Sequence, residues 1–340
     1  MNSMEGNERI FEPDYLDKAD GAENRLRPKD FSEYVGQAKI LENVKVMVES
    51  ATMREAAMDH LLLSGPPGLG KTSLAMIIAH ELGVQLHVVS GPAIEKKGDL
   101  AAILTGLEPR DLLFIDEIHR MHISVEEILY SAMEDFRLDI VIGQGAAAKT
   151  MKIDLAPFTL VGATTRSGLL SNPLRDRFMG DLHFDFYEPT ELAKILNTNA
   201  GKLNLKVTDE ALGIMSRCAR GTPRIANRIL RRVRDFAVVA RQEQIGKAEV
   251  SKALELMEID ALGLDRMDRK ILKVILEYYS GGPVGIEALA ATLGEDRQTI
   301  EEVYEPYLLK EGFLLRTPRG REISTRSKDM LGAQISFKFD

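Results

Sequence analysis

The stretch Gly65-Pro66-Pro67-Gly68-Leu69-Gly70-Lys71-Thr72 decides the fold of this chain. It follows the apolar run Leu61-Leu62-Leu63 and precedes residues 73–79, whose apolar sequence is typical of a buried helix. A strand, a glycine-rich loop and a helix in that order form the context of a phosphate-binding loop. Glycines let consecutive backbone N–H groups turn toward an anion, and the helix N-terminus adds partial positive charge. We therefore predict a nucleoside triphosphate site here, rather than a simple turn before a core helix.

Two side chains of this loop have expected roles in phosphate chemistry. Lys71 can reach the β- and γ-phosphates, and the Thr72 hydroxyl can hold a Mg2+ ion. Downstream, Asp116-Glu117 follows the apolar run Leu112-Leu113-Phe114-Ile115. Adjacent acids there suit separate tasks, with Asp116 as a second Mg2+ contact and Glu117 as the base that activates water. The competing interpretation, a helix N-cap, is the weaker one downstream of a phosphate-binding loop.

Three further polar segments follow later elements of the chain. Thr164-Thr165-Arg166 ends another apolar run, and a hydroxyl there can contact the γ-phosphate. An arginine of Leu174-Arg175-Asp176-Arg177 can neutralise transition-state charge in a neighbouring subunit, although a salt bridge with Asp176 is the alternative. Gly221-Thr222-Pro223-Arg224 opens a helix, where Arg224 either contacts the nucleotide's phosphates or is a surface residue.

Length and composition limit the number of domains and the kind of protein that this chain can be. The chain has 340 residues, of which 44% are hydrophobic and 28% charged, so two or three domains are expected. A single cysteine, Cys218, excludes an internal disulfide and favours a reducing compartment. The polar N-terminus and the lack of a long apolar run predict a soluble, cytoplasmic protein that does not enter a membrane. The formal net charge of −8 argues against nonspecific coating of nucleic acid.

Alternating apolar strands and helices predict an α/β fold. The expected strands are residues 61–63, 86–89, 112–115 and 159–163, in a parallel sheet covered on both faces. Ligands of such sheets lie at the carboxyl ends of the strands, where the phosphate-binding loop is found. Residues 137–153 have the pattern of a β-hairpin. Its apolar residues either project as a binding surface or fold onto their own domain.

The whole chain divides into four expected parts. They are an N-terminal arm (1–22), the phosphate-loop domain (23–187), a helical subdomain (188–260) and a winged-helix-like domain of three helices and a hairpin (261–340). Two arginine-rich segments, 217–241 and 316–328, are either anion-binding surfaces or ordinary solvated faces.

Taken together, these motifs resemble the AAA+ ATPases. More narrowly, Arg27-Pro28, GPPGLGKT, LLFIDEIHR, GATTR, PLRDRF and RGTPRIANR are similar to the RuvB family, the bacterial motors of Holliday junction branch migration. The resemblance runs from about Leu26 to the C-terminal wing. It implies an AAA+ P-loop domain, an α-helical lid and a C-terminal winged-helix domain. It also implies a homohexameric ring that hydrolyses ATP with Mg2+ and translocates duplex DNA in recombination and repair, recruited by a RuvA-like protein and joined by a RuvC-like resolvase.

The resemblance further implies roles for individual residues. Arg177 matches the arginine finger given in trans, with Arg175 as the second choice, and Arg224 matches a sensor on the lid. Thr165 is placed in the catalytic set, although Thr164 is equally open as the sensor threonine. The hairpin 137–153 corresponds to the RuvA-docking element. The expected nucleotide contacts are Leu26, Arg27 and Tyr187 at the adenine, Gly68, Gly70, Lys71, Thr72 and Ser73 at the phosphates, and Glu134, Asp135 and Phe136 nearby; the expected DNA contacts are Arg316 and Arg321.

Two alternatives compete with this interpretation. Asp116-Glu117-Ile118-His119 has the DExH form of another helicase superfamily, but that class needs a second RecA-like domain where residues 190–258 are predicted to be helical. A nucleotide-switched transcription regulator would combine the ATPase with a winged helix bound to one DNA sequence. Basic residues at a hairpin tip contact phosphates and carry no base information, which favours the motor. ATPase activity that depends on duplex length, together with junction unwinding, would distinguish the motor from the regulator.

Overall fold

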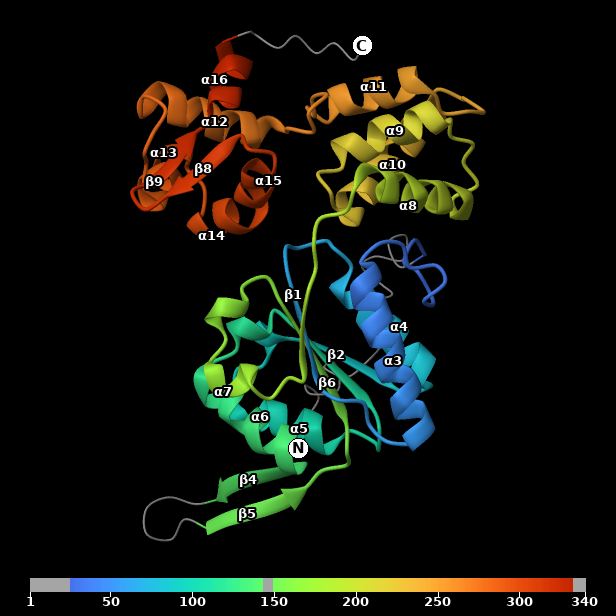
Figure 1. Cartoon of the computed structure of the whole chain (residues 1–340), viewed down its shortest axis with the longest axis vertical. Helices are drawn as coiled ribbons and strands as arrows, with labels where there is room; N and C mark the ends of the chain where they lie inside the picture. The colour runs from blue at the N-terminus through green and yellow to red at the C-terminus, as the bar shows by residue number, and fades with distance from the viewer. Residues whose placement is uncertain (1–24, 143–148, 333–340) are drawn as a thin grey trace, which may run out of the picture. The chain divides into compact units, whose positions relative to one another are not determined.

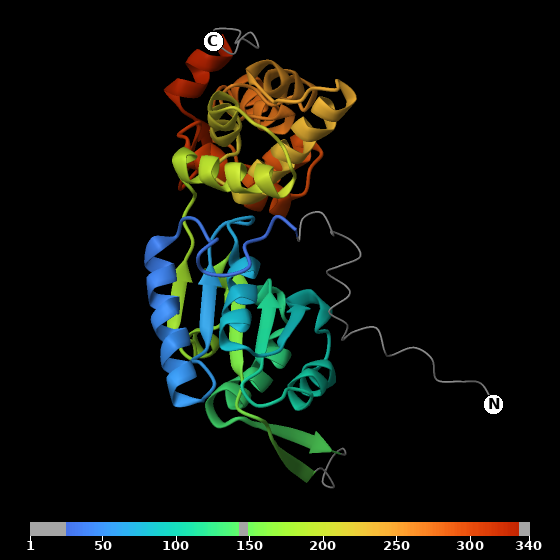
Figure 2. The same cartoon turned by 90° about the vertical axis from the view of Figure 1, so that its right-hand side faces the viewer.

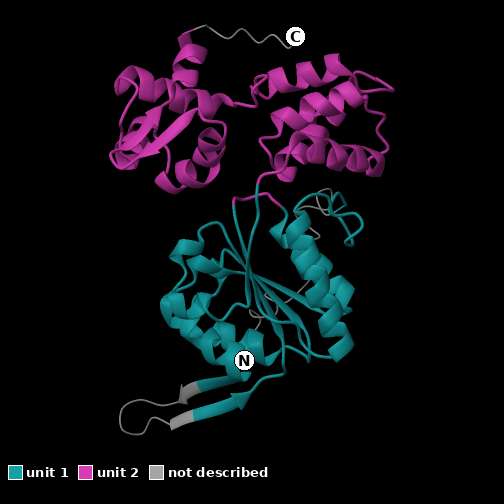
Figure 3. Cartoon of the chain, in the orientation of Figure 1, with its two compact units in different colours: residues 1–65, 70–185 teal, residues 66–69, 186–340 magenta. Residues whose placement is uncertain are grey.

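The computed structural model describes residues 25–142 and 149–332. The chain forms two compact units, shown in different colours in Figure 3. Unit 1 contains residues 1–65 and 70–185, and unit 2 contains residues 66–69 and 186–340. The expected arm and the tip of the hairpin lie outside the described residues. Unit 2 therefore includes a short piece of the phosphate-binding loop together with the C-terminal part of the chain.

A parallel sheet of five strands forms the centre of unit 1, in the order β2-β3-β6-β1-β7 (Figure 1). The strands are β1 (Leu61–Ser64), β2 (Leu86–Ser90), β3 (Leu112–Asp116), β6 (Thr159–Thr164) and β7 (Gly180–His183). The α/β class and the four predicted strands are confirmed. The strand β7, which pairs with β1, was not predicted. It is a short edge strand with no fully buried residue, so it has no apolar run for a sequence pattern to detect.

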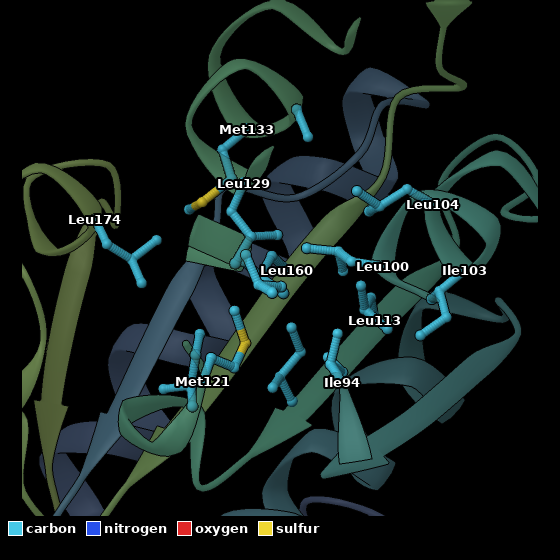
Figure 4. Packing of buried hydrophobic residues seen from close by; sticks show 14 of the residues in the cluster. Ile94, Leu100, Ile103, Leu104, Leu113, Met121, Leu129, Met133, Leu160 and Leu174 are labelled. Carbon is cyan, nitrogen blue, oxygen red and sulfur yellow. The ribbon is translucent and has the colours of Figure 1, made fainter. Parts of the chain in front are cut away.

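Helices cover both faces of the sheet, as a parallel sheet requires. Figure 1 shows α3 (Ala38–Arg54) and α4 (Lys71–Leu82) on one side, and α5 (Lys97–Thr105), α6 (Ile123–Asp135) and α7 (Asn172–Arg175) on the other. Beneath α5 and α6 the core is apolar, with Leu100, Leu113, Leu129 and Leu160 gathered between helices and strands (Figure 4). Short 3-10 turns at Gly91–Ala93, Ile118–Arg120 and Ser167–Leu169 follow β2, β3 and β6.

A β-hairpin of unit 1 lies in the chain between α6 and β6. It consists of β4 (Arg137–Ile142) paired antiparallel with β5 (Lys149–Asp154). Figures 1 and 2 show it projecting from the end of unit 1 rather than folded against the sheet. Leu138 at its base and Leu155 just after β5 are buried in the same core as α6. The hairpin is therefore fixed at its base and extends away from the body of unit 1.

The part of unit 2 that follows the sheet is helical, as predicted. Its helices are α8 (Pro189–Lys202), α9 (Asp209–Cys218), α10 (Pro223–Val239) and α11 (Lys247–Leu256). Each of them buries an apolar face. The helix α10, for example, buries Ile229 and Val233 but leaves Arg228 and Arg232 exposed.

The last part of unit 2 has the helices and two-stranded hairpin of a winged helix. Its elements are α12 (Arg266–Tyr278), α13 (Ile286–Leu293), α14 (Arg297–Thr299), η5 (Ile300–Tyr304), α15 (Glu305–Lys310), β8 (Leu314–Thr317), β9 (Gly320–Ile323) and α16 (Thr325–Gly332). The third helix of this domain, predicted over residues 297–309, is divided into α14, η5 and α15 because η5 is π-helical. The helix α16 was not predicted, since its only buried residue is Ser327. Within residues 25–142 and 149–332, no helix combines the length and apolar character needed to cross a bilayer.

Candidate active site and DNA-binding surface

The loop Gly65–Thr72 connects β1 to α4 and starts at the carboxyl edge of the sheet. Gly65 N donates a hydrogen bond to Thr164 O over 3.2 Å, which ties the start of the loop to the end of β6. All three glycines of the loop have positive φ, a conformation that favours glycine. A side chain at position 65 would also lie 2.6 Å from Phe184 O. The loop thus has the glycine-dependent backbone of an anion cradle.

Lys71, the first residue of α4, is only 8% exposed. Its Nζ donates a hydrogen bond to Gly65 O over 2.8 Å, so the ammonium group lies at the start of the loop. Thr72 and Ser73 follow in the first turn of α4 and are partly exposed. The N–H groups of a first helical turn have no acceptor within their own helix. Together with the ammonium group they fit the predicted triphosphate.

The acidic pair lies at the end of β3. Asp116 is the last residue of the strand, and Glu117 follows it in a left-handed conformation with φ of 50°. Glu117 N donates to Asp116 Oδ1 over 3.0 Å. The turn also requires Gly91, because a side chain there would lie 2.4 Å from Glu117 O. The Asp116 carboxylate and the Thr72 hydroxyl supply oxygen atoms of the kind that Mg2+ prefers, so the expected metal ligands suit that ion.

The two threonines at the end of β6 have different surroundings. Thr165 is partly exposed, and its Oγ1 donates to Glu117 Oε2 over 3.4 Å. Thr164 is fully buried, and its Oγ1 lies 2.9 Å from His119 Nδ1. That same His119 nitrogen lies 3.3 Å from Glu117 Oε2. The structure therefore brings Thr165 to Glu117 and gives Thr164 a buried, supporting position. Sequence reasoning assigned His119 no catalytic role, and its only signal was proximity to the acids.

Arg177 is held at the surface of unit 1 by groups of α6 and α7. Its guanidinium donates to Glu134 Oε2 over 3.0 Å and to two backbone carbonyls, Tyr130 O over 3.3 Å and Pro173 O over 2.6 Å. Its Cζ lies 4.7 Å from the centre of the Tyr130 ring. The acidic partner of Arg177 is thus Glu134, not the neighbouring Asp176. Arg175 is exposed.

A second set of hydrogen bonds fixes α7 against α6. Ser171 Oγ accepts from Leu174 N to cap α7. It also donates to Glu126 Oε2 over 2.7 Å and lies 2.9 Å from Tyr130 Oη. Burial raises the pKa of Glu126, and the hydrogen bond from Ser171 partly opposes that rise. Tyr130 therefore supports Arg177 both directly and through this network, a role that sequence reasoning did not assign to it.

The residues expected at the adenine belong to both units. Leu26 is buried in unit 1, where Arg27 Nη1 donates to Met76 Sδ over 3.2 Å. Tyr187 is buried in unit 2, where its hydroxyl donates to Leu69 O over 3.1 Å. The contact between Tyr187 and the phosphate-binding loop is made within unit 2.

The three residues of the segment 134–136 differ in their exposure and contacts. Glu134 and Asp135 are exposed, and Asp135 pairs with Arg137 over 3.0 Å. Phe136 instead packs edge-on against the rings of His60 and Phe158. Of the three expected nucleotide neighbours, Phe136 is thus engaged in the packing of unit 1.

Arg224 is brought to the phosphate-binding loop through its backbone. It is the second residue of α10, and its N–H donates to Gly68 O over 3.3 Å within unit 2. A side chain at position 68 would lie 3.0 Å from Arg224 Cβ, so the close approach depends on a glycine. The Arg224 residue itself is exposed.

The two arginines expected to contact DNA differ in exposure. The side chain of Arg316, on β8, is 61% exposed and lies 4.0 Å from Glu301. That of Arg321, on β9, is 8% exposed and forms ion pairs with Glu301 and with the buried Glu305. Arg321 therefore neutralises a buried carboxylate and holds the wing onto α15. Arg316, with the exposed Arg319, forms the exposed basic surface of the wing, and the expected DNA contact of Arg321 stays a prediction.

Three models of protein-family domains match the chain in succession. Residues 26–184 match the Holliday junction DNA helicase RuvB P-loop domain, residues 187–260 the RuvB AAA lid domain, and residues 261–332 the RuvB C-terminal winged helix domain. These matches fit the parallel sheet, the helical part and the winged helix described above.

Proteins named Holliday junction branch migration complex subunit RuvB are similar along most of the chain. The protein of Kosmotoga olearia is 56% identical over 307 residues, which are 90% of each chain. The protein of Myxococcus xanthus is 57% identical over 305 residues, which are 90% of this chain and 89% of the relative. That of Lactococcus lactis subsp. lactis is 51% identical over 326 residues, or 96% of each chain.

A solved structure shows the same similarity. The Thermotoga maritima RuvB Holliday junction branch migration motor matches with a TM-score of 0.84 and 51% identity, over 92% of this chain and all of that one. The transcription-regulator alternative gains no support from these matches.

Proposed function

The chain belongs to the RuvB family of Holliday junction branch migration motors, and we propose that it acts as an ATP-hydrolysing hexameric ring that moves duplex DNA. The observation that carries this proposal is the contact between Thr165 and Glu117. It joins the expected catalytic base to the end of β6, which is hydrogen-bonded to the start of the phosphate-binding loop. A base, a polar hydroxyl and a phosphate cradle at one edge of a sheet are the parts that an ATPase requires.

In this proposal each polar residue at the carboxyl edge of the sheet has one task. Gly68 and Gly70 let the backbone of the loop approach the phosphates, and the Lys71 ammonium group neutralises the β- and γ-phosphates. Thr72 and Asp116 would hold Mg2+, which when bound would neutralise charge on the phosphate oxygens. Glu117 accepts a proton from the attacking water as the water oxygen bonds to the γ-phosphorus and the bond to the β-phosphate oxygen breaks. Thr165 orients that water beside Glu117.

Residues outside this edge complete the proposed nucleotide site. Leu26, Arg27 and Tyr187 border the adenine, Ser73 adds a contact to the phosphates, and Arg224 senses them from the lid. Arg177 is given to the nucleotide of the neighbouring subunit, beside the segment 134–136. The support for this trans role is that Arg177 is held at the surface by Glu134, whose side chain is 58% exposed.

The proposed partners follow from the projecting elements and from the family. We assign the hairpin β4–β5 to a RuvA-like junction-binding protein, because its base is anchored and its strands extend from the body. Arg316 contacts duplex DNA through its phosphates, which positions the wing without reading sequence. The RuvC-like resolvase in the same complex, the helicase activity and the cytoplasmic location are further parts of the proposal.

Branch migration of a synthetic four-way junction, with and without the RuvA-like partner, tests this function. We expect ATP hydrolysis that rises with duplex length, and ATP-dependent unwinding of the junction. Lys71→Ala removes the ammonium group from the loop, so both activities should be lost. Lys39→Ala, which changes an exposed lysine of α3, serves as the matched control. One tight, sequence-specific DNA site with little DNA-stimulated hydrolysis would refute the motor.

A further inference from the structure

One arginine of the segment 217–241 is buried rather than solvated. Arg220 is 4% exposed and has a left-handed backbone with φ of 55°. It lies between α9 and α10, directly before the turn Gly221-Thr222-Pro223-Arg224. Its charge therefore does not belong to the exposed arginines of α10, and its partners define a different role.

Within the described part of the chain, the ion-pair and hydrogen-bond partners of Arg220 come from the start of the winged-helix domain. Its Nη2 lies 2.7 Å from Asp265 Oδ2 and 2.5 Å from Asp268 Oδ2, and its Nε donates to Gly263 O over 2.9 Å. Its Cζ lies 5.4 Å from the centre of the Tyr307 ring on α15. Asp265 and Asp268 also cap α12, since each accepts a hydrogen bond from the backbone N–H of the other. The first turn of α12 is thus built around a residue of the lid.

Burial makes this cluster depend on its arginine. Asp268 is fully buried, which raises the pKa of its carboxyl to about 7, while the charge of Arg220 opposes that rise. Burial also raises the pKa of Asp265, but the charge of Arg220 and the hydrogen bonds to its carboxylate outweigh burial and leave this pKa lowered. A buried carboxylate deprived of its partner is strongly unfavourable. The cluster therefore favours one fixed arrangement of lid and winged helix.

The linker between the lid and the winged helix, residues 258–264, is held by hydrogen bonds from side chains of the winged-helix domain. Arg269 on α12 donates to Glu258 O over 2.9 Å and to Leu264 O over 2.8 Å. Tyr307 Oη donates to Leu262 O over 2.6 Å. Leu264 is fully buried in the winged-helix core. A segment bonded and buried in this way resists local opening, so the linker is a rigid joint.

The turn that follows Arg220 also contacts the phosphate-binding loop within unit 2. Arg224 N donates to Gly68 O over 3.3 Å. Gly221 O accepts from the N–H of Tyr187, whose hydroxyl donates to Leu69 O. The segment 220–224 is therefore bonded to the winged helix at its first residue and to the loop at its last.

We propose that Arg220 is a positioning residue that ties the turn carrying Arg224 to the first helix of the winged-helix domain. Through this tie, a displacement of Arg224 on nucleotide binding or release moves the lid and the DNA-binding domain as one body. Arg220 acts through Arg224 on one side and through Asp265 and Asp268 on the other. The inference rests on the ATPase function proposed above, and it adds how hydrolysis is converted into movement of DNA.

Four variants of the full-length chain test the tie. Arg220→Met keeps most of the volume and removes the charge, whereas Arg220→Lys keeps the charge and loses the forked geometry. The double variant with Arg220→Met and Asp268→Asn avoids an uncompensated buried carboxylate, in case the single variant does not fold. Arg217→Met changes an exposed arginine of α9 and is the matched control. Thermal unfolding establishes which variants are folded.

Two quantities report the coupling rather than the fold. One is the ratio of duplex DNA affinities measured with a non-hydrolysable ATP analogue and with ADP, and the other is the number of base pairs migrated per ATP hydrolysed. We expect folded Arg220 variants without the charge to bind ATP normally but to lose about fivefold or more of the affinity ratio, with fewer base pairs moved per ATP. Arg220→Lys should fall between these variants and wild type, and Arg217→Met should match wild type.

The outcomes separate this inference from the function on which it rests. Folded Arg220 variants with wild-type values of both quantities would overturn the tie, as would an equal loss in Arg217→Met. A wild-type protein that does not hydrolyse ATP would instead overturn the proposed function.

Discussion

His60 is a buried histidine whose hydrogen bonds require a neutral ring. Leu160 N donates to His60 Nδ1 over 2.8 Å, so the other nitrogen, Nε2, donates to Met133 O at 3.1 Å. Burial lowers the pKa of His60 below its ordinary value of 6.5, although the Met133 carbonyl partly opposes this. Below pH 6.5 the unfolded chain therefore binds a proton that the folded chain does not. Stability should fall with falling pH in that range, by at most about 1.4 kcal/mol per pH unit.

The variant His60→Gln isolates this effect because glutamine does not titrate. We expect the variant to be less stable than wild type at every pH but to lose less stability on acidification. Urea unfolding of both proteins at about pH 7.5 and about pH 5.5 measures the difference, and groups common to both proteins cancel. Equal losses in the two proteins would contradict the assignment of a neutral buried ring.

Glu117 shows how far the site can be predicted at the scale of the residue. An acid directly after a buried strand and downstream of a glycine-rich loop could be identified from the sequence. The direction of its carboxylate could not, because its left-handed backbone has no sequence signal in a residue other than glycine. That conformation costs on the order of 1–3 kcal/mol. It is fixed by the space at Gly91 and by contacts with His119 and Thr165, none of which forms a motif with Glu117.

The wing gives a prediction at the scale of the element. Arg321→Ala leaves the buried Glu305 without its partner, so we expect about 3–5 kcal/mol of lost stability and a lower Tm. Arg316→Ala changes an exposed side chain, so the Tm should be unchanged. The affinity of Arg316→Ala for duplex DNA should fall for all DNA sequences, and the slope of log affinity against log salt concentration should be reduced by about 1. Thermal unfolding and duplex titrations at several salt concentrations measure the two effects.

The outcome for Arg321 decides between its two assigned roles. If Arg321→Ala unfolds at the wild-type temperature yet binds DNA weakly, the residue contacts DNA directly as the family resemblance implies. A similar loss of Tm in Arg316→Ala would contradict the division of roles between the two arginines.

Elements could be predicted where burial imposes a periodic apolar pattern. The strands β1 and β6 are fully buried, and α10 has a continuous apolar face, so all three were expected. The strand β7 and the helix α16 bury little of themselves. The strand forms because β1 offers it an open edge, a tertiary cause that leaves no pattern within four residues of sequence. The burial of Arg321 was missed for the same reason, since its acidic partners lie on two other elements, η5 and α15.

At the scale of the whole molecule, the trans role of Arg177 predicts complementation between two inactive proteins. Lys71→Ala subunits lack a working loop but still present Arg177, while Arg177→Ala subunits have the loop but lack the finger. Each protein alone should be impaired, the Arg177 variant by about 10³–10⁵ in rate with nucleotide binding retained. Mixed rings should regain ATP hydrolysis at those interfaces that combine an intact loop with an intact arginine.

Controls for the mixing experiment come from the same segment. Arg175→Ala should hydrolyse ATP on its own if Arg177 is the finger. Mixtures with no recovered activity would contradict the trans role, as would an Arg177→Ala protein that is fully active by itself. This assembly property could not be derived from one chain, because the sequence marks Arg177 as a candidate without showing which nucleotide it faces.

The base of the hairpin β4–β5 separates the projecting strands from the core of unit 1. Phe136 O accepts a hydrogen bond from Leu155 N over 2.8 Å, so the chain enters and leaves the hairpin at one closed point. Leu138 and Leu155 seal the core there. The strands β4 and β5 therefore form an insertion that meets the core of unit 1 at this base, so substitutions in the hairpin are expected to leave the sheet unaltered. Under the proposed function, the hairpin that binds the RuvA-like partner and the edge that hydrolyses ATP can therefore change independently of each other, in evolution or by design.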